Sequence, residues 1–207
     1  MLNLLDLIPK KDEYYDKNKK FSKGLSSCDI GLVRTYSLNP IDTFIANKIN
    51  SITSGLFNHV FIMGKNGDVI EAELSGVKVN QLSKYINNDD GVLVFRNNTL
   101  NEEQKKNILA YSYAQINTHY DLFGVISFLF SKEINFNNSN KLFCSELVYN
   151  AYSTANVHIS YKNEKISPND IFYYLKNHLS DNEQGWIIQD YKKLNINKII
   201  LKGEKLW

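Results

Sequence analysis

Asn58-His59-Val60-Phe61-Ile62-Met63-Gly64-Lys65-Asn66-Gly67-Asp68-Val69-Ile70-Glu71-Ala72-Glu73 is the stretch on which the predicted fold depends. It contains two short apolar runs separated by an Asn-Gly pair, a pattern that strongly favours a β-hairpin. The first strand is predicted to run from His59 to Gly64 and the second from Asp68 to Glu73. A histidine and a glutamate are thereby placed on adjacent antiparallel strands.

The length of the hairpin loop decides whether His59 and Glu71 share a face of the sheet. With a two-residue loop, His59 lies opposite Leu74, and Glu71 points to the other face because side chains alternate along a strand. With a three-residue loop whose last residue, Gly67, is left-handed, His59 pairs with Glu73 and Glu71 joins the face of His59. A catalytic pairing of His59 with Glu71 requires the three-residue loop, and we predict that loop.

A second segment, Phe143-Cys144-Ser145-Glu146-Leu147-Val148-Tyr149, is predicted to begin a helix with an apolar stripe. A helix N-terminus stabilises negative charge, so a thiol placed there forms the reactive thiolate more readily. A free cysteine is as often a small buried apolar residue. Thiol chemistry on an acyl group also needs an imidazole and a polar group that orients it. Among the four histidines, His59 stands out because Glu71 can be that third group.

The remaining pattern predicts one α+β domain. We expect a lead-in over residues 1–26, a catalytic domain over residues 27–180 and an extension over residues 181–207 that packs on the same domain. The further predicted elements are a strand at Ile30–Arg34, a helix from Pro40 to about Ile52, a strand at Val92–Arg96, a helix from Asn101 to about Asn117, a helix capped by Ser167 with Pro168 at its first position, and a strand near Ile196–Leu201.

Composition narrows the class of protein. The chain has 207 residues, which suffices for one well-formed core, and its formal net charge of +2 gives no footprint for nucleic acid. Its two cysteines, Cys28 and Cys144, form neither a disulfide framework nor a metal-ligand spacing. No apolar run reaches the length of a membrane span, and the N-terminus lacks the pattern of a signal peptide. We therefore expect a cytoplasmic protein.

Several segments in this order resemble the circularly permuted papain-like family of the NlpC type, in its YiiX-like branch, which is related to the lecithin retinol acyltransferase group. The segments are Cys28-Asp29-Ile30-Gly31-Leu32-Val33-Arg34, Asn58-His59-Val60-Phe61-Ile62-Met63-Gly64, Asp68-Val69-Ile70-Glu71-Ala72, Gly76-Val77, and Phe143-Cys144-Ser145-Glu146-Leu147-Val148-Tyr149. The resemblance extends from about Ser27 to Asp170. It implies an antiparallel sheet packed against the nucleophile helix, with the histidine strand preceding that helix.

The resemblance also implies roles for individual residues. Cys144 resembles the nucleophile, His59 the general base and acid, and Glu71 the group that orients the imidazole. Asp29 matches the aspartate of a Gly-Asp motif that opens a strand, with Cys28 where glycine is usual, and is expected to bind substrate. Tyr120 matches a Tyr-Asp pair and is a second candidate substrate-binding residue, although packing under a loop explains it equally well.

These residues favour a cysteine hydrolase that cleaves amide bonds of small peptides or amino-acid amides through a thioester on Cys144, with no metal or organic cofactor. One alternative is a lipid-directed acyltransferase or thioesterase of the same fold, and another is an inactive binding module. The apolar run Leu122–Phe130 is predicted to be a buried element, although it leaves a peripheral membrane contact open. A further alternative makes Cys28 the nucleophile with His119 or His158, but Cys28 precedes a strand and lacks a helix N-terminus.

Overall fold

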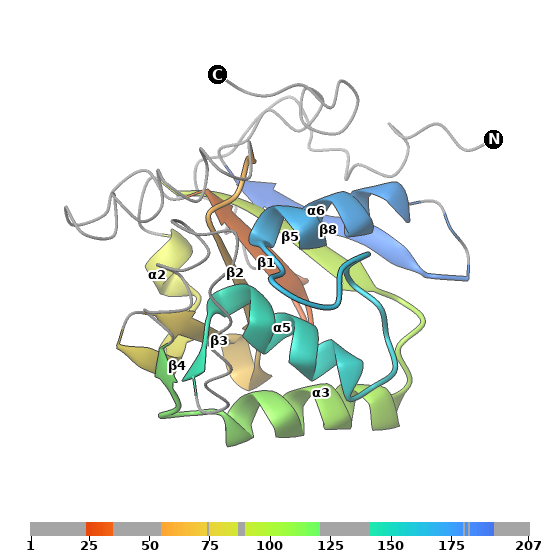
Figure 1. The fold of residues 1–207 in the computed structure, drawn as a ribbon. Helices are drawn as coiled ribbons and strands as arrows, with labels where there is room; N and C mark the ends of the chain where they lie inside the picture. The colour runs from red at the N-terminus through yellow and green to blue at the C-terminus, as the bar shows by residue number, and fades with distance from the viewer. Residues whose placement is uncertain are drawn as a thin grey trace.

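The computed structural model describes residues 24–34, 55–73, 75–86, 90–120, 141–179, 181 and 183–192. Its main feature is a six-stranded sheet in the order β4-β3-β2-β1-β5-β8, in which every pair of neighbouring strands is antiparallel (Figure 1). The strands are β1 (Ile30–Arg34), β2 (His59–Met63), β3 (Asp68–Glu73), β4 (Gly76–Gln81), β5 (Gly91–Asn97) and β8 (Trp186–Lys192). The sheet with its helices confirms the predicted α+β class.

Four α-helices lie among the described residues: α2 (Ser83–Ile86), α3 (Glu102–Ala114), α5 (Cys144–Ser153) and α6 (Pro168–Asn177). A parallel pair of two-residue strands, β6 (His119–Tyr120) and β7 (Lys141–Leu142), leads into α5. Asn101 and Ser167 each cap a helix through a capping box, and Pro168 occupies the first turn of α6 as the sequence predicted. These caps satisfy N–H groups that have no partner within their helices.

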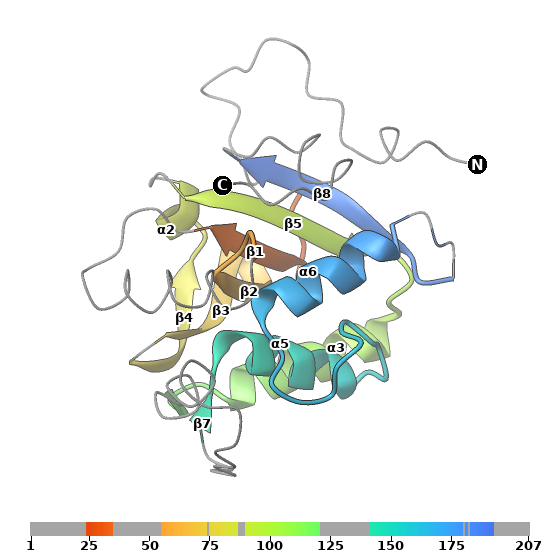
Figure 2. The same cartoon turned by 45° about the horizontal axis from the view of Figure 1, so that its top comes forward.

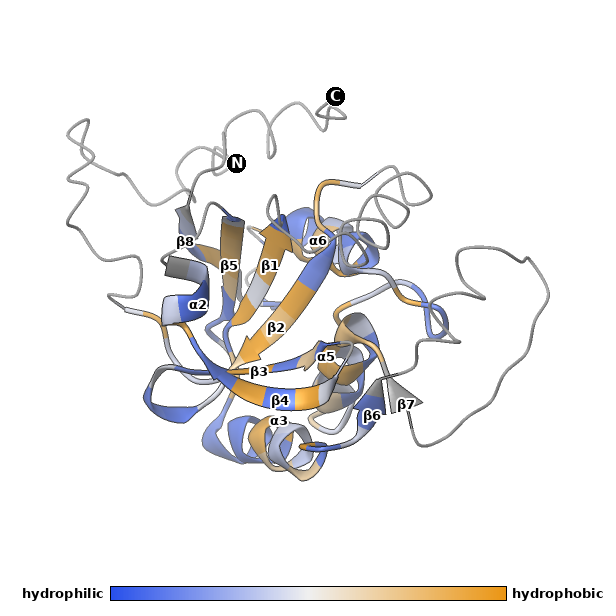
Figure 3. Cartoon of the chain, turned by 90° about the vertical axis from the view of Figure 1, so that its left-hand side faces the viewer, coloured by the Kyte–Doolittle hydropathy of each residue, from blue (hydrophilic) through white to orange (hydrophobic). Residues whose placement is uncertain are grey.

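The sheet separates two cores. Helices α3, α5 and α6 cover one face, where Val60, Ile62 and Ile70 pack with Leu147 and Val148 of α5. Helix α2 covers the other face, and its neighbours there include Phe61, Met63 and Val69. Figures 2 and 3 show α2 and α5 on opposite sides of the sheet. Because side chains alternate along β2, Phe61 and Met63 face α2, whereas Val60 and Ile62 face α5.

The C-terminal part of the described chain belongs to the same sheet. Strand β8, which lies within the expected extension over residues 181–207, pairs with β5 and forms one edge of the sheet. Trp186, its first residue, is 1% exposed and lies in the core beside Tyr152. Neither β8 nor β4 was predicted from the sequence, and α2 was not predicted either.

Some predictions fall outside the described residues: the helix from Pro40, the apolar run Leu122–Phe130, the strand near Ile196–Leu201 and most of the lead-in. Within the described ranges, no helix is both long enough and apolar enough to cross a membrane. The hairpin, the sheet and the Cys144 helix, which together carry Cys144, His59 and Glu71, all lie within the described residues.

Candidate active site

Cys144 is the first residue of α5. Phe143 is the N-cap residue and makes no side-chain capping bond, so its side chain does not occupy the N–H groups of the first turn. The apolar face of α5 fixes the helix against β2 and β3, and the Ser145 hydroxyl donates to the Ile166 carbonyl at 2.5 Å. The thiol is thereby held at a rigid helix start, and Cys144 is 5% exposed.

The loop between β2 and β3 has the three-residue form that the sequence predicted. Its residues are Lys65–Gly67, and the Gly64 N–H donates to the Asp68 carbonyl at 2.8 Å to close it. Asn66 and Gly67 have φ angles of 56° and 82°, the left-handed conformations that asparagine and glycine tolerate. Ile62 pairs with Ile70 and Met63 with Val69, which confirms the predicted register.

That register brings His59 and Glu71 to one face of the sheet. The distance between Nε2 of His59 and Oε2 of Glu71 is 2.6 Å. Glu71 is fully buried, whereas the His59 side chain is 18% exposed. Because Nε2 is engaged by the carboxylate, Nδ1 is the ring nitrogen left for the thiol.

The electrostatics of the site link all three groups. Burial lowers the pKa of His59, but the charge of Cys144, a hydrogen bond with Cys144, and then the hydrogen bond and charge of Glu71 raise the pKa of His59 to about 10. Burial raises the pKa of Glu71, but His59 and Lys84 outweigh burial and hold the pKa of Glu71 well below its usual value. The structure therefore brings Cys144, His59 and Glu71 together as a thiol, an imidazole and an ionised carboxylate.

Three polar residues around Glu71 were not singled out from the sequence. Asn80 Nδ2 donates to Oε1 of Glu71 at 2.7 Å, and Lys84 Nζ lies 2.8 Å from the same oxygen. The Tyr85 hydroxyl donates to Oε2, the oxygen that also faces His59. These residues come from β4 and α2, which were not predicted from the sequence. Asn80 could have been located if a strand had been predicted over Gly76–Gln81.

The segment that leads into His59 is held by Asn169 at the start of α6. The side-chain oxygen of Asn169 accepts from the N–H groups of Leu56 and Phe57 at 2.8 and 3.0 Å, and its amide donates to the Phe57 carbonyl at 2.8 Å. Asn169 is 2% exposed, and a Cβ on Gly55 would lie 1.9 Å from its side-chain nitrogen. This amide therefore replaces strand pairing just before His59 and requires glycine at position 55.

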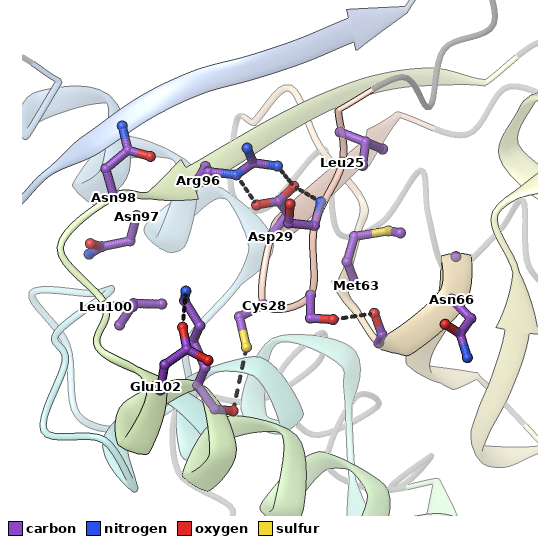
Figure 4. A pocket seen from close by; sticks show the side chains of 15 residues that line it. Leu25, Cys28, Asp29, Met63, Asn66, Arg96, Asn97, Asn98, Leu100 and Glu102 are labelled. Atoms are coloured by element: carbon purple, nitrogen blue, oxygen red, sulfur yellow. Dashed lines mark hydrogen bonds and ion pairs between the residues drawn. The ribbon is translucent and has the colours of Figure 1, made fainter.

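Asp29 does not join this cluster. Ile30 pairs with Ile62 and Val33 pairs with His59, so Asp29 lies at the opposite end of the β1–β2 pair from His59. Its carboxylate accepts from Arg96 Nε at 2.8 Å and from Arg96 Nη2 at 2.7 Å. The two residues line a separate cavity of about 610 Å³ (Figure 4). The structure therefore does not place Asp29 with Cys144, His59 and Glu71, and its role in substrate binding remains a prediction.

Cys28 also lines the Asp29 cavity, with its side chain 2% exposed. The Cys28 Sγ donates to the Lys105 carbonyl at 3.6 Å. Burial, followed by the negative charge of Asp29, raises the pKa of Cys28 to about 12. Its thiol is therefore held in the neutral form, which does not suit a nucleophile.

The other predicted site residue, Tyr120, is in β6, where its backbone pairs with Leu142. Its side chain is outside the described part of the chain, so its role in binding remains a prediction. In the described ranges, no group of three or more His, Cys, Asp or Glu side chains has the arrangement of a metal site. The chemistry available at the described site is that of a thiol, an imidazole and a carboxylate.

The chain also matches a known protein family. A family model described as "permuted papain-like amidase enzyme, YaeF/YiiX, C92 family" matches residues 40–184, which include Cys144, His59 and Glu71. No match to this chain was found among curated proteins. Because the matched region covers more than half of the chain, the chain belongs to the YaeF/YiiX family of papain-like amidases, which are cysteine hydrolases.

Proposed function

We propose that this protein hydrolyses amide bonds of small peptides or amino-acid amides through a thioester on Cys144. The observation that carries the proposal is the position of His59, whose ring is bound by Glu71 at Nε2 and whose pKa is raised by Cys144. A thiol acting on an amide needs a partner that first stabilises the thiolate and then protonates the leaving nitrogen. His59 can do both.

In the first half of the reaction, the Cys144 thiolate attacks the carbonyl carbon of the amide, and the carbonyl electron pair moves to the oxygen. The backbone N–H of Cys144, at the first position of α5, is suited to stabilise that oxyanion. The tetrahedral intermediate then collapses with cleavage of the C–N bond. His59 gives the Nδ1 proton to the departing nitrogen, and the acyl group remains on Cys144 as a thioester.

In the second half, water attacks the thioester carbon and His59 accepts a proton from that water. Cleavage of the C–S bond releases the carboxylic acid and restores the thiolate beside a protonated His59. The carboxylate of Glu71 keeps Nε2 of His59 protonated and turned toward itself. Nδ1 therefore carries the transferred proton in both halves of the reaction. No step requires a group other than the substrate, water and these residues.

We also propose that the papain-like elements are connected in permuted order. The proposal is supported by the order along this chain, in which the His59 strand precedes the Cys144 helix, and by the description of the family. Papain has the reverse order. The substrate class rests on the amidase description of the family, and the thioester on Cys144 rests on the geometry of the site.

The test is acyl trapping on the full chain with a panel of amino-acid amides, dipeptide amides and long-chain fatty acyl esters. We expect release of amine from the amides and, by intact and peptide mass spectrometry, a transient acyl adduct on Cys144. Cys28→Ala should retain both results and Cys144→Ala should lose both. An adduct on Cys28, or turnover of the fatty acyl esters alone, would contradict the proposal.

A further inference from the structure

The carboxylate of Glu71 is saturated with donors. Oε2 accepts from Tyr85 and faces Nε2 of His59, while Oε1 accepts from Asn80 and lies 2.8 Å from Nζ of Lys84. A carboxylate offers about four acceptor positions, and these four partners fill them. A proton on either oxygen would displace one of the partners. The geometry thus favours the ionised form and disfavours transfer of a proton from His59 to Glu71.

Two of these donors are consecutive residues of α2, a helix outside the Cys144 core. The Tyr85 ring stacks on Phe61 with centroids 5.0 Å apart and lies 6.4 Å from the His59 ring at an interplanar angle of 26°. Tyr85 is 3% exposed, so its hydroxyl is fixed in place. Lys84 binds Glu71 and also Glu73, which fastens α2 to the hairpin.

We propose that Lys84 and Tyr85 are positioning residues, which keep Glu71 ionised and hold its Oε2 against Nε2 of His59. Lys84 supplies the positive charge that offsets burial of the carboxylate. Tyr85 fixes the oxygen that orients the imidazole, and its ring restricts the ring of His59 from the side of α2. The inference rests on the proposed function of His59, because a positioning role has meaning only if that ring transfers protons.

Two cationic groups oppose burial, which raises the pKa of Glu71. His59 from β2 lowers the pKa of Glu71 most but is charged only when protonated, and Lys84 from α2 is the next largest cause. Glu73 on β3 and Asp90 before β5 are negative and raise the pKa of Tyr85, after burial and Glu71. Tyr85 therefore remains a protonated donor. Without Lys84, His59 would be the cation left to offset burial of the Glu71 carboxylate, with Asn80 and Tyr85 as neutral donors.

The test follows the carboxyl carbon of Glu71 by ¹³C NMR as a function of pH, with the full chain and without substrate. The pH series runs from pH 8 down to the onset of acid unfolding, and we expect the wild-type carbon to titrate only at the lowest end of that series. In Lys84→Met the midpoint should rise by about one pH unit or more, because a charge that opposes burial is lost. Tyr85→Phe should shift it by less, and Lys84→Arg should restore the wild-type behaviour.

The matched control is Lys78→Met. Lys78 pairs directly with Glu71 in the β3–β4 register but is exposed. Lys78→Met therefore removes one positive charge near Glu71, as Lys84→Met does, but from a solvent-exposed position. This variant should titrate like the wild type. Identical titrations of Lys84→Met and Lys78→Met would overturn the proposal. If Lys84→Met does not fold, the comparison is made with Tyr85→Phe, and an unshifted Glu71 carbon there overturns the role of Tyr85.

A kinetic measurement separates positioning from a purely structural role. In Tyr85→Phe we expect kcat to fall about 3- to 10-fold with KM unchanged, and the acidic limb of the kcat profile to move to higher pH with the Glu71 carbon. Equal losses at every pH would contradict positioning. If Glu71 titrates as expected and no amide is cleaved, the amidase proposal fails and the electrostatic role of Lys84 stands.

Discussion

The two cysteines of this protein are both buried, at 2% and 5% exposure, yet their surroundings differ in the features that control thiol chemistry. Cys144 begins a helix and interacts with His59, whereas Cys28 precedes a strand and has Asp29 as its next residue. One thiol thus lies beside an imidazole that can exchange protons with it, and the other lies beside a carboxylate whose charge raises the pKa of Cys28 further, after burial. Burial alone would not have distinguished a nucleophile from a core residue.

The same contrast extends along the β1–β2 pair. At the end that contains His59, the buried carboxylate of Glu71 is bound to an imidazole that faces a thiol. At the other end, the buried carboxylate of Asp29 is bound to Arg96, which is always charged and cannot exchange protons at ordinary pH. One end is therefore suited to proton transfer and the other to holding the sheet and loops together.

Replacement of the two thiols should produce the largest difference. Cys144→Ala is expected to reduce amide hydrolysis by about 10³-fold or more, because no other described group can form the thioester. Cys28→Ala should change the rate by less than about twofold. Iodoacetamide labelling near pH 7 gives an independent measurement, with fast modification of Cys144 and slow modification of Cys28. Fast labelling of Cys28 would reverse the assignment.

Glu71→Gln should have the next largest effect. The substitution keeps the shape of the side chain but removes the charge that stabilises the protonated ring, so we expect kcat to fall roughly 10²- to 10⁴-fold. Asp29→Asn, the same change at the other buried carboxylate, is the matched control and should leave kcat within about threefold. Similar losses in both variants would mean that the two ends of the sheet are not functionally distinct.

Arg96→Met tests how much the Asp29–Arg96 ion pair contributes to the stability of the protein. Removal of the guanidinium leaves the Asp29 carboxylate, which is 1% exposed, with the Ser26 N–H as a remaining donor. Because Arg96 is itself 23% exposed, we expect a loss of about 2–3 kcal/mol in the free energy of unfolding, below the range for fully buried pairs. Urea unfolding measures this value, and the iodoacetamide rate of Cys144 should stay unchanged. A large change in that rate would couple the two sites.

The pH dependence of stability should also distinguish Cys144, which interacts with His59, from Cys28. His59 has a folded pKa of about 10, above its ordinary 6.5, so its contribution is complete below pH 6.5 and is lost as pH rises through about 10. Glu71 has a lowered pKa, so its contribution is present above pH 4.5 and is lost as pH falls through the lowered value.

Because the charge of Cys144 is the first cause that raises the pKa of His59, Cys144→Ala should lose this contribution at lower pH than the wild type. Thermal unfolding between pH 6.5 and 10.5 measures the difference in Tm between the two proteins. Cys28→Ala, which removes a thiol from the other end of β1, should follow the wild-type curve with a constant offset up to about pH 9. Above that pH the raised pKa of Cys28 costs the wild type stability that the variant does not lose. Parallel curves for Cys144→Ala and the wild type would contradict the link between Cys144 and His59.

The sequence could predict the core of the site because its determinants are local. Asn66 and Gly67 select the loop that fixes the hairpin register, and that register alone decides whether Glu71 faces His59. Cys144 at a helix start is equally readable from neighbouring residues. These features require no knowledge of which distant strands pair.

The features that the sequence did not predict are non-local. Asp29 was predicted to bind substrate because it matches the Gly-Asp motif of the family, and that motif does not reveal where Asp29 lies relative to His59, which depends on the antiparallel pairing of β1 with β2. Tyr85 and Lys84 are on a four-residue helix whose residues gain their function only when α2 packs on the finished hairpin. Strand β8 has polar residues on a sheet edge, which hides the alternation typical of a strand.

The smallest expected effect concerns the backbone of Cys28, whose φ of 69° lies in the left-handed region. A residue with a Cβ is disfavoured there by roughly 1 kcal/mol or more, which gives a physical reason for glycine in the Gly-Asp motif. Cys28→Ala loses the buried sulfur and keeps this strain, whereas Cys28→Gly loses the sulfur and relieves the strain. Urea unfolding should therefore show Cys28→Gly to be more stable than Cys28→Ala by about 1 kcal/mol, with Ser27→Gly against Ser27→Ala as the neighbouring control. If Cys28→Ala is the more stable variant, the backbone of Cys28 is not strained. The presence of cysteine at the Asp29 end of the β1–β2 pair would then need another explanation.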